Sequence, residues 1–145
     1  MSDVRSELLV HVVWAVEGRE PTLSIDRDAW LHERLAAESA KVRTELVAVG
    51  NASDHVHVLV DLNRGVAIAT LVQQLKGASS HAWNLRADAP VLRWQAGYFA
   101  ESIARADREN VAAYVRAQRA HHLERAPDGG FTQEAPVSNR GRGRS

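Results

Sequence analysis

The sequence predicts an α+β fold built around one antiparallel sheet. Three observations indicate it: short runs rich in β-branched residues alternate with longer segments of helical periodicity, two of the runs are separated by only a few turn-forming residues, and a last helical segment follows the final run. The chain has 145 residues, of which 45% are apolar and 25% charged. These values are typical of one folded domain and differ from those of disordered chains.

The first two predicted elements are a strand and a helix. Residues 8–16 (LLVHVVWAV) form a run typical of a strand, which Gly18 and Pro21 close. A helix is expected next, with Asp26 as its N-cap. Its apolar positions recur at helical spacing, at Leu31, Leu35 and Val42, with Trp30 beside them.

A hairpin is predicted in the middle of the chain. Residues 46–49 are a short strand, residues 50–53 (GNAS) are a loop of turn-forming residues, and residues 54–62 (DHVHVLVDL) are the clearest strand in the sequence. Because the two strands lie so close together along the chain, we expect them to pair in antiparallel fashion.

Side chains alternate across the second strand of this hairpin. The set expected to face the helices is Val56, Val58 and Val60, and the opposite set is His55, His57 and Leu59. Two imidazoles at positions i and i+2 lie within reach of one divalent ion. The same pattern also occurs in semi-buried histidines that bond to their neighbours, so the strand alone leaves both interpretations open.

Gly65 ends the hairpin, and a second helix is expected at about residues 66–86. Its apolar face consists of Ile68, Leu71, Val72, Leu75 and Ala82, with Ser79 in the next position. Pro90 ends the following connection, and residues 97–103 (GYFAESI) are the expected fourth strand.

Asp107 is the expected N-cap of a third helix, which has Glu109 in its first turn and reaches about Arg125. The order is therefore βαββαβ plus a terminal helix, which matches the ferredoxin-like split βαβ arrangement with two helices on one face of the sheet. The domain is expected to span residues 1–126, because residues 127–145 have the composition of a disordered tail.

The terminal helix carries candidate partners for the two histidines of the hairpin. Tyr114 and Gln118 are four residues apart and share one face, with His121 and His122 a turn further on. A phenol beside a divalent ion can attack a phosphate, because the ion stabilises the charge that develops there. A tyrosine anchored at the edge of the core, next to a solvated polar stripe, explains the same pattern.

Five segments in this order resemble the HUH single-strand transposases, most closely the REP-associated tyrosine transposases and their insertion-sequence-200-like relatives. The segments are residues 11–23 (HVVWAVEGREPTL), 54–60 (DHVHVLV), 75–84 (LKGASSHAWN), 93–103 (RWQAGYFAESI) and 114–122 (YVRAQRAHH). Together the segments extend over most of the predicted domain. Five motifs in the same order are far more specific than any single one.

The resemblance implies a metal-dependent enzyme that cleaves and rejoins single-stranded DNA at hairpin-bearing ends. By resemblance, His55 and His57 are the HUH pair that binds Mg²⁺ or Mn²⁺, Gln118 is the third protein ligand, and Tyr114 is the nucleophile. The expected intermediate is a 5′-phosphotyrosine with a free 3′-hydroxyl on the other strand end. The role of His121 and His122 stays open, since histidines are also favoured at the end of a helix by its dipole.

The resemblance also implies a homodimer, in which the tyrosine helix of one subunit sometimes completes the site of the other. The family pairs through its strands, so the first strand is expected to be exposed as an interface. Lys76, Arg93 and Trp94 are the expected contacts with hairpin DNA, where Trp94 would stack on an unpaired base. A core position under the fourth strand explains Trp94 equally well.

The charge distribution permits a DNA partner without requiring one. The chain carries 18 basic and 18 acidic side chains; residues 1–72 have 7 and 11 of them, and residues 73–145 have 11 and 7. A net charge of zero is low for a protein that holds DNA by neutralising its phosphates. Glu17 and Glu20 also lie in a turn that is usually basic in the family.

Several classes of protein are excluded by composition. The absence of cysteine excludes disulfide scaffolds, cysteine zinc sites, iron–sulfur clusters and thiol nucleophiles. No apolar run approaches the ~20 residues that span a bilayer, and the first residues lack the apolar core of a signal peptide, so a cytoplasmic, nucleoid-associated protein is expected. Two alternatives to a transposase remain: a domesticated relative that binds repeat hairpins without mobilising them, and a non-catalytic ferredoxin-like module with incidental histidines.

Overall fold

A computed structural model describes residues 3–86 and 88–123, so the predicted tail lies outside the described residues. Its sheet has four antiparallel strands, β1 (Leu9–Ala15), β2 (Glu45–Asn51), β3 (His55–Asp61) and β4 (Phe99–Ser102), in the order β2-β3-β1-β4. This order is that of a ferredoxin-like sheet and confirms the predicted fold class. Because β1 lies between β3 and β4, the expectation that the first strand is an exposed edge is wrong; β2 and β4 are the edge strands.

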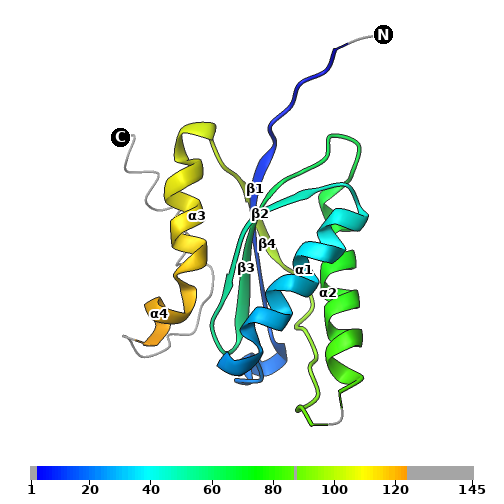
Figure 1. The fold of residues 1–145 in the computed structure, drawn as a ribbon, viewed down its shortest axis with the longest axis vertical. Helices are drawn as coiled ribbons and strands as arrows, with labels where there is room; N and C mark the ends of the chain where they lie inside the picture. Colours follow the sequence, from blue (N-terminus) through cyan, green and yellow to red (C-terminus); the bar gives the residue numbers. More distant parts are fainter. Residues whose placement is uncertain (1–2, 87, 124–145) are drawn as a thin grey trace.

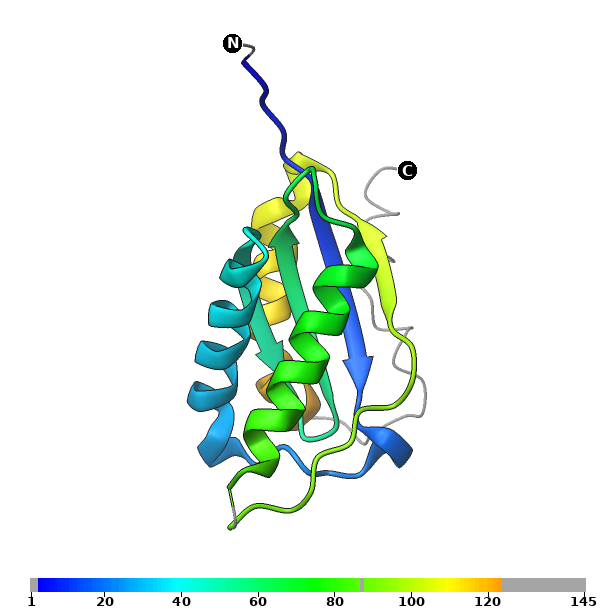
Figure 2. The same ribbon diagram turned by 90° about the vertical axis from the view of Figure 1, so that its right-hand side faces the viewer.

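Helices cover both faces of the sheet. The helices α1 (Asp28–Lys41) and α2 (Ile68–Asn84) lie side by side on one face, and α3 (Arg108–Arg116) and α4 (Gln118–Leu123) lie on the other (Figures 1 and 2). The single terminal helix that the sequence predicts is therefore two helices, which break at Ala117. None of the helices in the described ranges is long and apolar enough to cross a bilayer.

Three local predictions are corrected by the structure. Asp26 does not cap the first helix, because it lies in a 3-10 turn (Ile25–Arg27) and α1 begins two residues later. Asp107 does occupy the N-cap position of α3, but its side chain makes no capping hydrogen bond. The expected loop at residues 50–53 is shorter than predicted, because Gly50 and Asn51 continue β2.

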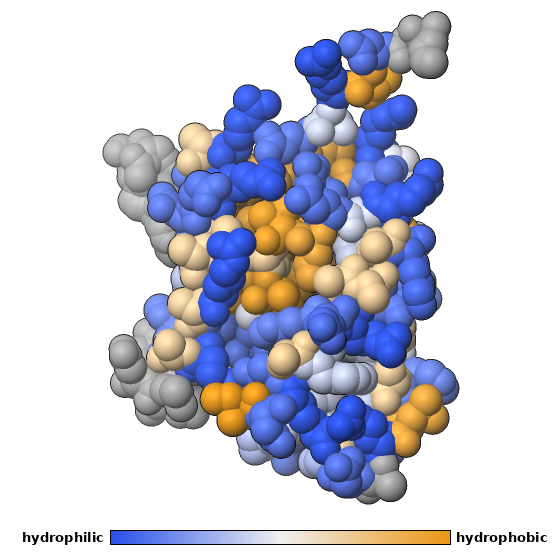
Figure 3. Space-filling model, in the orientation of Figure 1, coloured by the Kyte–Doolittle hydropathy of each residue, from blue (hydrophilic) through white to orange (hydrophobic). Residues whose placement is uncertain are grey.

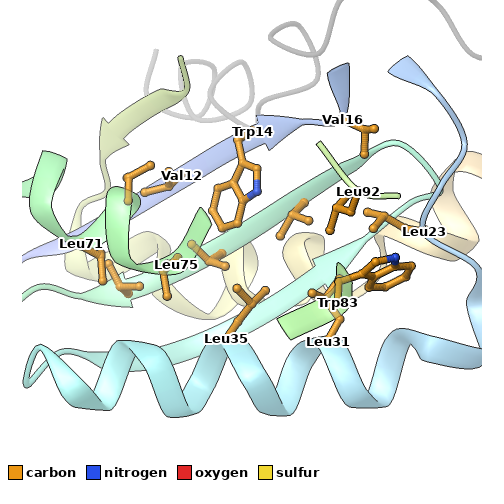
Figure 4. Packing of buried hydrophobic residues seen from close by; sticks show 14 residues of the cluster. Val12, Trp14, Val16, Leu23, Leu31, Leu35, Leu71, Leu75, Trp83 and Leu92 are labelled. Atoms are coloured by element: carbon orange, nitrogen blue, oxygen red, sulfur yellow. The ribbon is translucent and has the colours of Figure 1, made fainter. Parts of the chain in front are cut away.

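The main core lies between the sheet and the pair α1 and α2 (Figure 4). As predicted, Val56, Val58 and Val60 of β3 face these helices. They pack with other fully buried side chains, among them Val12, Trp14, Leu31, Leu35, Leu71, Leu75 and Trp83. Burying a large apolar side chain contributes about 1.5–3 kcal/mol, so this layer supplies most of the hydrophobic stabilisation.

A smaller apolar cluster lies on the opposite face, between the sheet and α3. It consists of Leu9, Ala48, Leu59, Val111, Ala112 and Val115. In the space-filling view, apolar side chains gather between α3 and α1, where the edge strand β2 carries the half-buried Leu46, Val47 and Val49 (Figure 3). The smaller cluster holds α3 on the sheet and so determines where the side chains of α3 lie.

Candidate active site

Three histidines lie beneath α3 on the face of the sheet opposite the main core. His55 and His57 alternate with the core valines of β3, which confirms their predicted orientation. His11 of β1 joins them, because β1 pairs with β3 so that His11 is diagonal to His57. All three side chains are at most 1% exposed. Buried imidazoles require partners, so their hydrogen bonds define the site.

His55 is held by an acid at the start of its strand. Its Nδ1 lies 2.8 Å from Asp54 Oδ1, and Arg19 Nε donates to the other carboxylate oxygen at 3.1 Å. Burial raises the pKa of Asp54, but the hydrogen bonds and charges of His55 and Arg19 outweigh it and hold that pKa below its usual value. Because an ionised carboxylate only accepts, His55 donates to Asp54 from Nδ1, and in the neutral form of the ring the lone pair then lies on Nε2.

His57 is held by another imidazole. Its Nδ1 lies 2.9 Å from His11 Nε2, in a fully buried contact. On the far side of His11, Nδ1 is 3.8 Å from Glu101 Oε2 of β4. His11 and Glu101 are direct cross-strand partners, so the three side chains form a row across β3, β1 and β4.

Tyr114 of α3 contacts these rings within the same chain. Its ring centroid is 5.7 Å from that of His57 and 6.3 Å from that of His11, both in edge-on geometry. The ring of His121 of α4 also contacts the phenol, with 5.5 Å between centroids. The structure therefore brings the predicted nucleophile and a predicted metal ligand together, in cis.

A glycine permits this close approach of α3. Gly50 is the cross-strand partner of His57, and its Cα faces the end of α3. A Cβ at this position would overlap the carbonyl oxygen of Val115 and lie 2.9 Å from its carbonyl carbon. Because Val115 directly follows Tyr114, the contact at Gly50 places the phenol beside His57.

Gln118, the other predicted ligand, is fully buried at the start of α4. Its Nε2 donates to the carbonyl oxygen of Tyr114 at 3.1 Å. Its Oε1 is buried and has no hydrogen-bond partner among residues 3–86 and 88–123. A buried amide oxygen without a hydrogen-bond partner costs free energy. An oxygen in this state has a lone pair to offer to a metal ion.

A bidentate ion pair fixes α4. The guanidinium of Arg119 donates to both carboxylate oxygens of Asp28, at 3.1 and 2.7 Å, and to the carbonyl of Leu23 at 2.9 Å. Asn51 at the end of β2 also donates to Asp28, at 3.1 Å. Asp28 therefore joins α1, α4 and β2 at one point and limits the movement of Gln118.

The donor set fits a divalent ion of intermediate hardness. His55 and His57 offer imidazole nitrogens, and Gln118 offers an amide oxygen. Within the described part of the chain, no group of three or more His, Cys, Asp or Glu side chains that could hold a metal ion is found. Imidazole and amide ligands together suit Mn²⁺ better than the harder Mg²⁺, which prefers oxygen ligands.

The residues predicted to contact DNA lie elsewhere. Trp94 packs edge-on against Trp14 of the main core, with 5.8 Å between ring centroids, and its indole N–H donates to Lys76 O and Ser79 Oγ of α2. The ammonium of Lys76 donates to the carbonyls of Gln95 and Gly97, both at 2.9 Å. Burial lowers the pKa of Lys76. Both side chains thus tie α2 to the chain before β4, on the opposite face from Tyr114.

Arg93 is exposed beside the same connection. Its carbonyl accepts a hydrogen bond from the N–H of Glu17, and Gln95 N–H donates to Ala15 O, so this segment extends the pairing of β1 beyond β4. Contacts of Lys76, Arg93 and Trp94 with DNA stay a prediction, and of the three only Arg93 has an exposed side chain.

Sequence reasoning did not identify His11, Glu101, Asp54, Gly50 or Arg119. One signal was present for His11: it alternates with Val12 and Trp14 as His55 alternates with Val56, which places it on the same face once the two strands pair. The roles of Gly50 and Arg119 depend on contacts with residues far away in the sequence, for which no local pattern exists.

Comparisons with known proteins concern the family and the fold of the chain. The IS200-like transposase family matches residues 4–118. Among solved structures, the chain is similar to a proposed transposase from Deinococcus radiodurans R1, with 24% identity and a TM-score of 0.62 over 82% of this chain and 98% of the other. It is also similar to a REP-associated tyrosine transposase bound to a REP hairpin, with 17% identity and a TM-score of 0.59 over 79% of this chain and 70% of the other.

A search of curated proteins finds no match. The two solved structures, both under 25% identical, establish that the fold is shared. The family match extends over all four strands and over Tyr114 and Gln118, which is most of the described chain. The chain therefore belongs to the IS200-like transposase family.

Proposed function

We propose that this protein is a metal-dependent single-strand DNA transferase that cleaves and rejoins hairpin-bearing ends through a phosphotyrosine. The observation that carries the proposal is the edge-on contact of Tyr114 with His57, between a phenol and an imidazole of one chain. The family match supports a transposase, and the site supplies the residues for this particular chemistry.

In the proposed reaction, Tyr114 Oη attacks the phosphorus of a phosphodiester. The new O–P bond replaces the bond to the 3′ oxygen, which leaves as a 3′-hydroxyl after taking up a proton, while the phenolic proton passes to solvent. The 5′ end stays on the enzyme as a phosphotyrosine. Attack by another 3′-hydroxyl reverses the step and releases the phenol, so the number of phosphodiester bonds is unchanged.

His55, His57 and Gln118 would hold the divalent ion, Mg²⁺ or Mn²⁺. When bound, the ion would polarise the phosphate and stabilise the charge of its transition state. The chain's own contribution is positional: Asp54 and His11 orient the two imidazoles, and the docked α3 holds the phenol against them.

Single-stranded DNA with a hairpin is the proposed partner. A similar protein was solved bound to a REP hairpin, which supports a substrate of this kind. Arg93 would contact a phosphate from its exposed position, whereas Lys76 and Trp94 would first have to release their contacts within the chain. We also propose a homodimer in the cytoplasm, near the nucleoid; the contact of Tyr114 with its own His57 favours subunits with separate sites.

The second candidate is a domesticated relative that binds hairpins without mobilising them. The formal net charge of zero favours weak binding to DNA and supports this reading. The joint presence of Tyr114, Gln118 and the two buried histidines argues against it, because a protein that only binds DNA does not need them. A non-catalytic ferredoxin-like module is disfavoured for the same reason.

The test is formation of a covalent adduct between protein and DNA. The protein is incubated with labelled single-stranded hairpins from the flanks of its gene, with Mn²⁺ or Mg²⁺, and separated on a denaturing gel. We expect an adduct that disappears in Tyr114→Phe and His57→Ala and persists in Tyr98→Phe, the only other tyrosine of the chain. Binding without an adduct would support the domesticated relative, and absence of binding to any hairpin would support the ferredoxin-like module.

A further inference from the structure

We propose that His11 is a positioning residue that fixes the ring orientation and tautomer of His57, with Glu101 fixing His11 in turn. This inference rests on the proposed function, because it treats His57 as a metal ligand. Neither His11 nor Glu101 contributes to the predicted ligand set, yet both lie in one row with His57 across three neighbouring strands.

The geometry of the row is specific. The rings of His11 and His57 lie nearly parallel, with 20° between their planes, and Nε2 of one is 2.9 Å from Nδ1 of the other. A distance of 2.9 Å between two ring nitrogens requires one N–H and one lone pair. The contact therefore exists in one of two directions, and each direction places the lone pair of His57 on a different nitrogen.

Glu101 selects the direction. Its Oε2 is 3.8 Å from His11 Nδ1, which is too long for a hydrogen bond but short enough for a carboxylate to favour a proton on that nitrogen. With Nδ1 protonated, neutral His11 accepts at Nε2. His57 then donates from Nδ1 and keeps its lone pair on Nε2, on the side of the ring away from His11.

The second predicted ligand is arranged in the same way. His55 uses Nδ1 to bond Asp54 at 2.8 Å. In both imidazoles, Nε2 is therefore the nitrogen that would bind the metal through its lone pair. Metal-binding histidines are commonly oriented by a partner on their other nitrogen. Asp54 does this directly for His55, whereas His57 lies one strand further from an acid and reaches Glu101 through His11.

His11 is not a candidate ligand itself. Its Nε2 is engaged with His57 Nδ1, and its Nδ1 faces Glu101. The side chain of His11 is fully buried, so bulk water does not reach its ring nitrogens to take the place of His57 or Glu101. Without these two partners, a buried histidine would cost free energy, since its imidazole loses its hydration and gains no hydrogen bond in return.

The test compares two substitutions at His11 in the full chain. His11→Gln keeps an acceptor near the position of Nε2, while His11→Phe keeps a ring and removes the acceptor. Mn²⁺ affinity is measured by titration calorimetry on the metal-free protein, and the tautomer of His57 by ¹⁵N NMR of its ring. We expect His11→Phe to weaken Mn²⁺ binding about 10- to 100-fold and to mix the His57 tautomers, and His11→Gln to restore most of both.

Controls separate this inference from the proposed function. The exposed His81→Phe should bind Mn²⁺ as the wild type does, and His57→Ala should not bind it. If the wild type binds no Mn²⁺, the proposed metal site and this inference both fail. If His57→Ala loses binding but His11→Phe retains the wild-type affinity and tautomer, only the role of His11 is overturned.

A second variant decides the matter if His11→Phe does not fold. Glu101→Gln removes the charge near His11 at nearly constant shape, on a short edge strand where substitution is better tolerated. We expect Mn²⁺ binding weakened by on the order of tenfold, with mixed tautomers at His57. Unchanged affinity together with an unchanged tautomer in Glu101→Gln would overturn the inference.

Discussion

The two faces of the sheet follow different physical rules. On the face of α1 and α2, the strands present valines and Trp14 to leucines and a tryptophan, in an apolar layer. On the face of α3 and α4, the same strands present His11, His55 and His57, with a buried glutamine above the sheet. The alternation of side chains along β1 and β3 lets the same two strands contribute to both faces.

This difference shows how the fold separates stability from chemistry. Burying apolar surface stabilises the first face, whereas each buried imidazole on the second must recover its lost hydration through a specific partner. The second face therefore combines the small apolar cluster under α3 with a few directional contacts, at Asp54, His11 and Arg119. Substitutions on the two faces should accordingly fail in different ways.

The largest effect is expected from a cavity in the first face. Leu35→Ala removes a fully buried side chain between α1 and the sheet. We expect the free energy of unfolding to fall by about 2–5 kcal/mol, measured by urea denaturation. The fraction of the variant that stays folded should still form the DNA adduct, and a specific loss of adduct in fully folded Leu35→Ala would contradict the separation of the two faces.

The next effect is expected from Gly50→Ala on the second face. The added methyl group overlaps the carbonyl of Val115, so α3 must shift and Tyr114 moves away from His57. A displacement of about 1 Å in a reacting group costs on the order of 100-fold in rate, which the rate of adduct formation would show.

Gly77→Ala is the matched control for Gly50→Ala. Gly77 lies within α2, and a Cβ there would meet nothing within 4 Å. Replacing a helical glycine by alanine stabilises a helix by up to about 1 kcal/mol, so this variant should be active and slightly more stable. Equal activity of Gly50→Ala and wild type would show that docking of α3 does not position the phenol.

A smaller effect is expected from Arg119→Gln. The variant loses the bidentate pair with Asp28, both partners of which are about one fifth exposed. For such a partly exposed pair we expect a loss of roughly 1 kcal/mol at most, together with faster hydrogen exchange in α4. Arg116→Gln, which loses one bond to the carbonyl of Val47, should leave α4 unchanged; equal exchange in the two variants would contradict the role of Asp28.

The smallest effect is a dependence of stability on acid pH. The pKa of Asp54 is lowered in the folded protein, so its contribution is complete above the unfolded pKa of about 3.9 and is lost as pH falls through the lower folded pKa. Asp54→Asn should therefore be less stable than wild type at neutral pH, with a gap that narrows below about pH 4. The free energies of unfolding of both proteins would be measured at a series of acid pH values, with tryptophan fluorescence as the signal. A difference between them that stays constant down to pH 2 would contradict a lowered pKa for Asp54.

The sequence predicts the apolar face better than the polar one. Alternation in β3 and helical periodicity at Leu31, Leu35 and Leu75 are local patterns, and the structure confirms the faces they predict. The order of the strands follows from the same elements. The boundaries fail where local signals mislead: Gly50 and Asn51 are typical of a loop, yet both pair with β3 and so continue the strand β2.

The candidate site was predicted only in part, for reasons of distance in the sequence. Tyr114 and His57 were expected together on the basis of resemblance, and their contact is now seen. The pairing of His11 with His57 requires the register of β1 on β3, which the sequence does not encode locally. The break at Ala117 is also locally invisible, because alanine is the strongest helix former.

The placement of Tyr114 on its own sheet has a kinetic consequence. A single polypeptide would contain every group needed for one cleavage event, so the turnover of each molecule would be independent of enzyme concentration. On dilution, the initial velocity would then stay proportional to the amount of protein. An enzyme whose reaction centre is shared between two subunits would instead lose velocity more steeply, because its subunits dissociate.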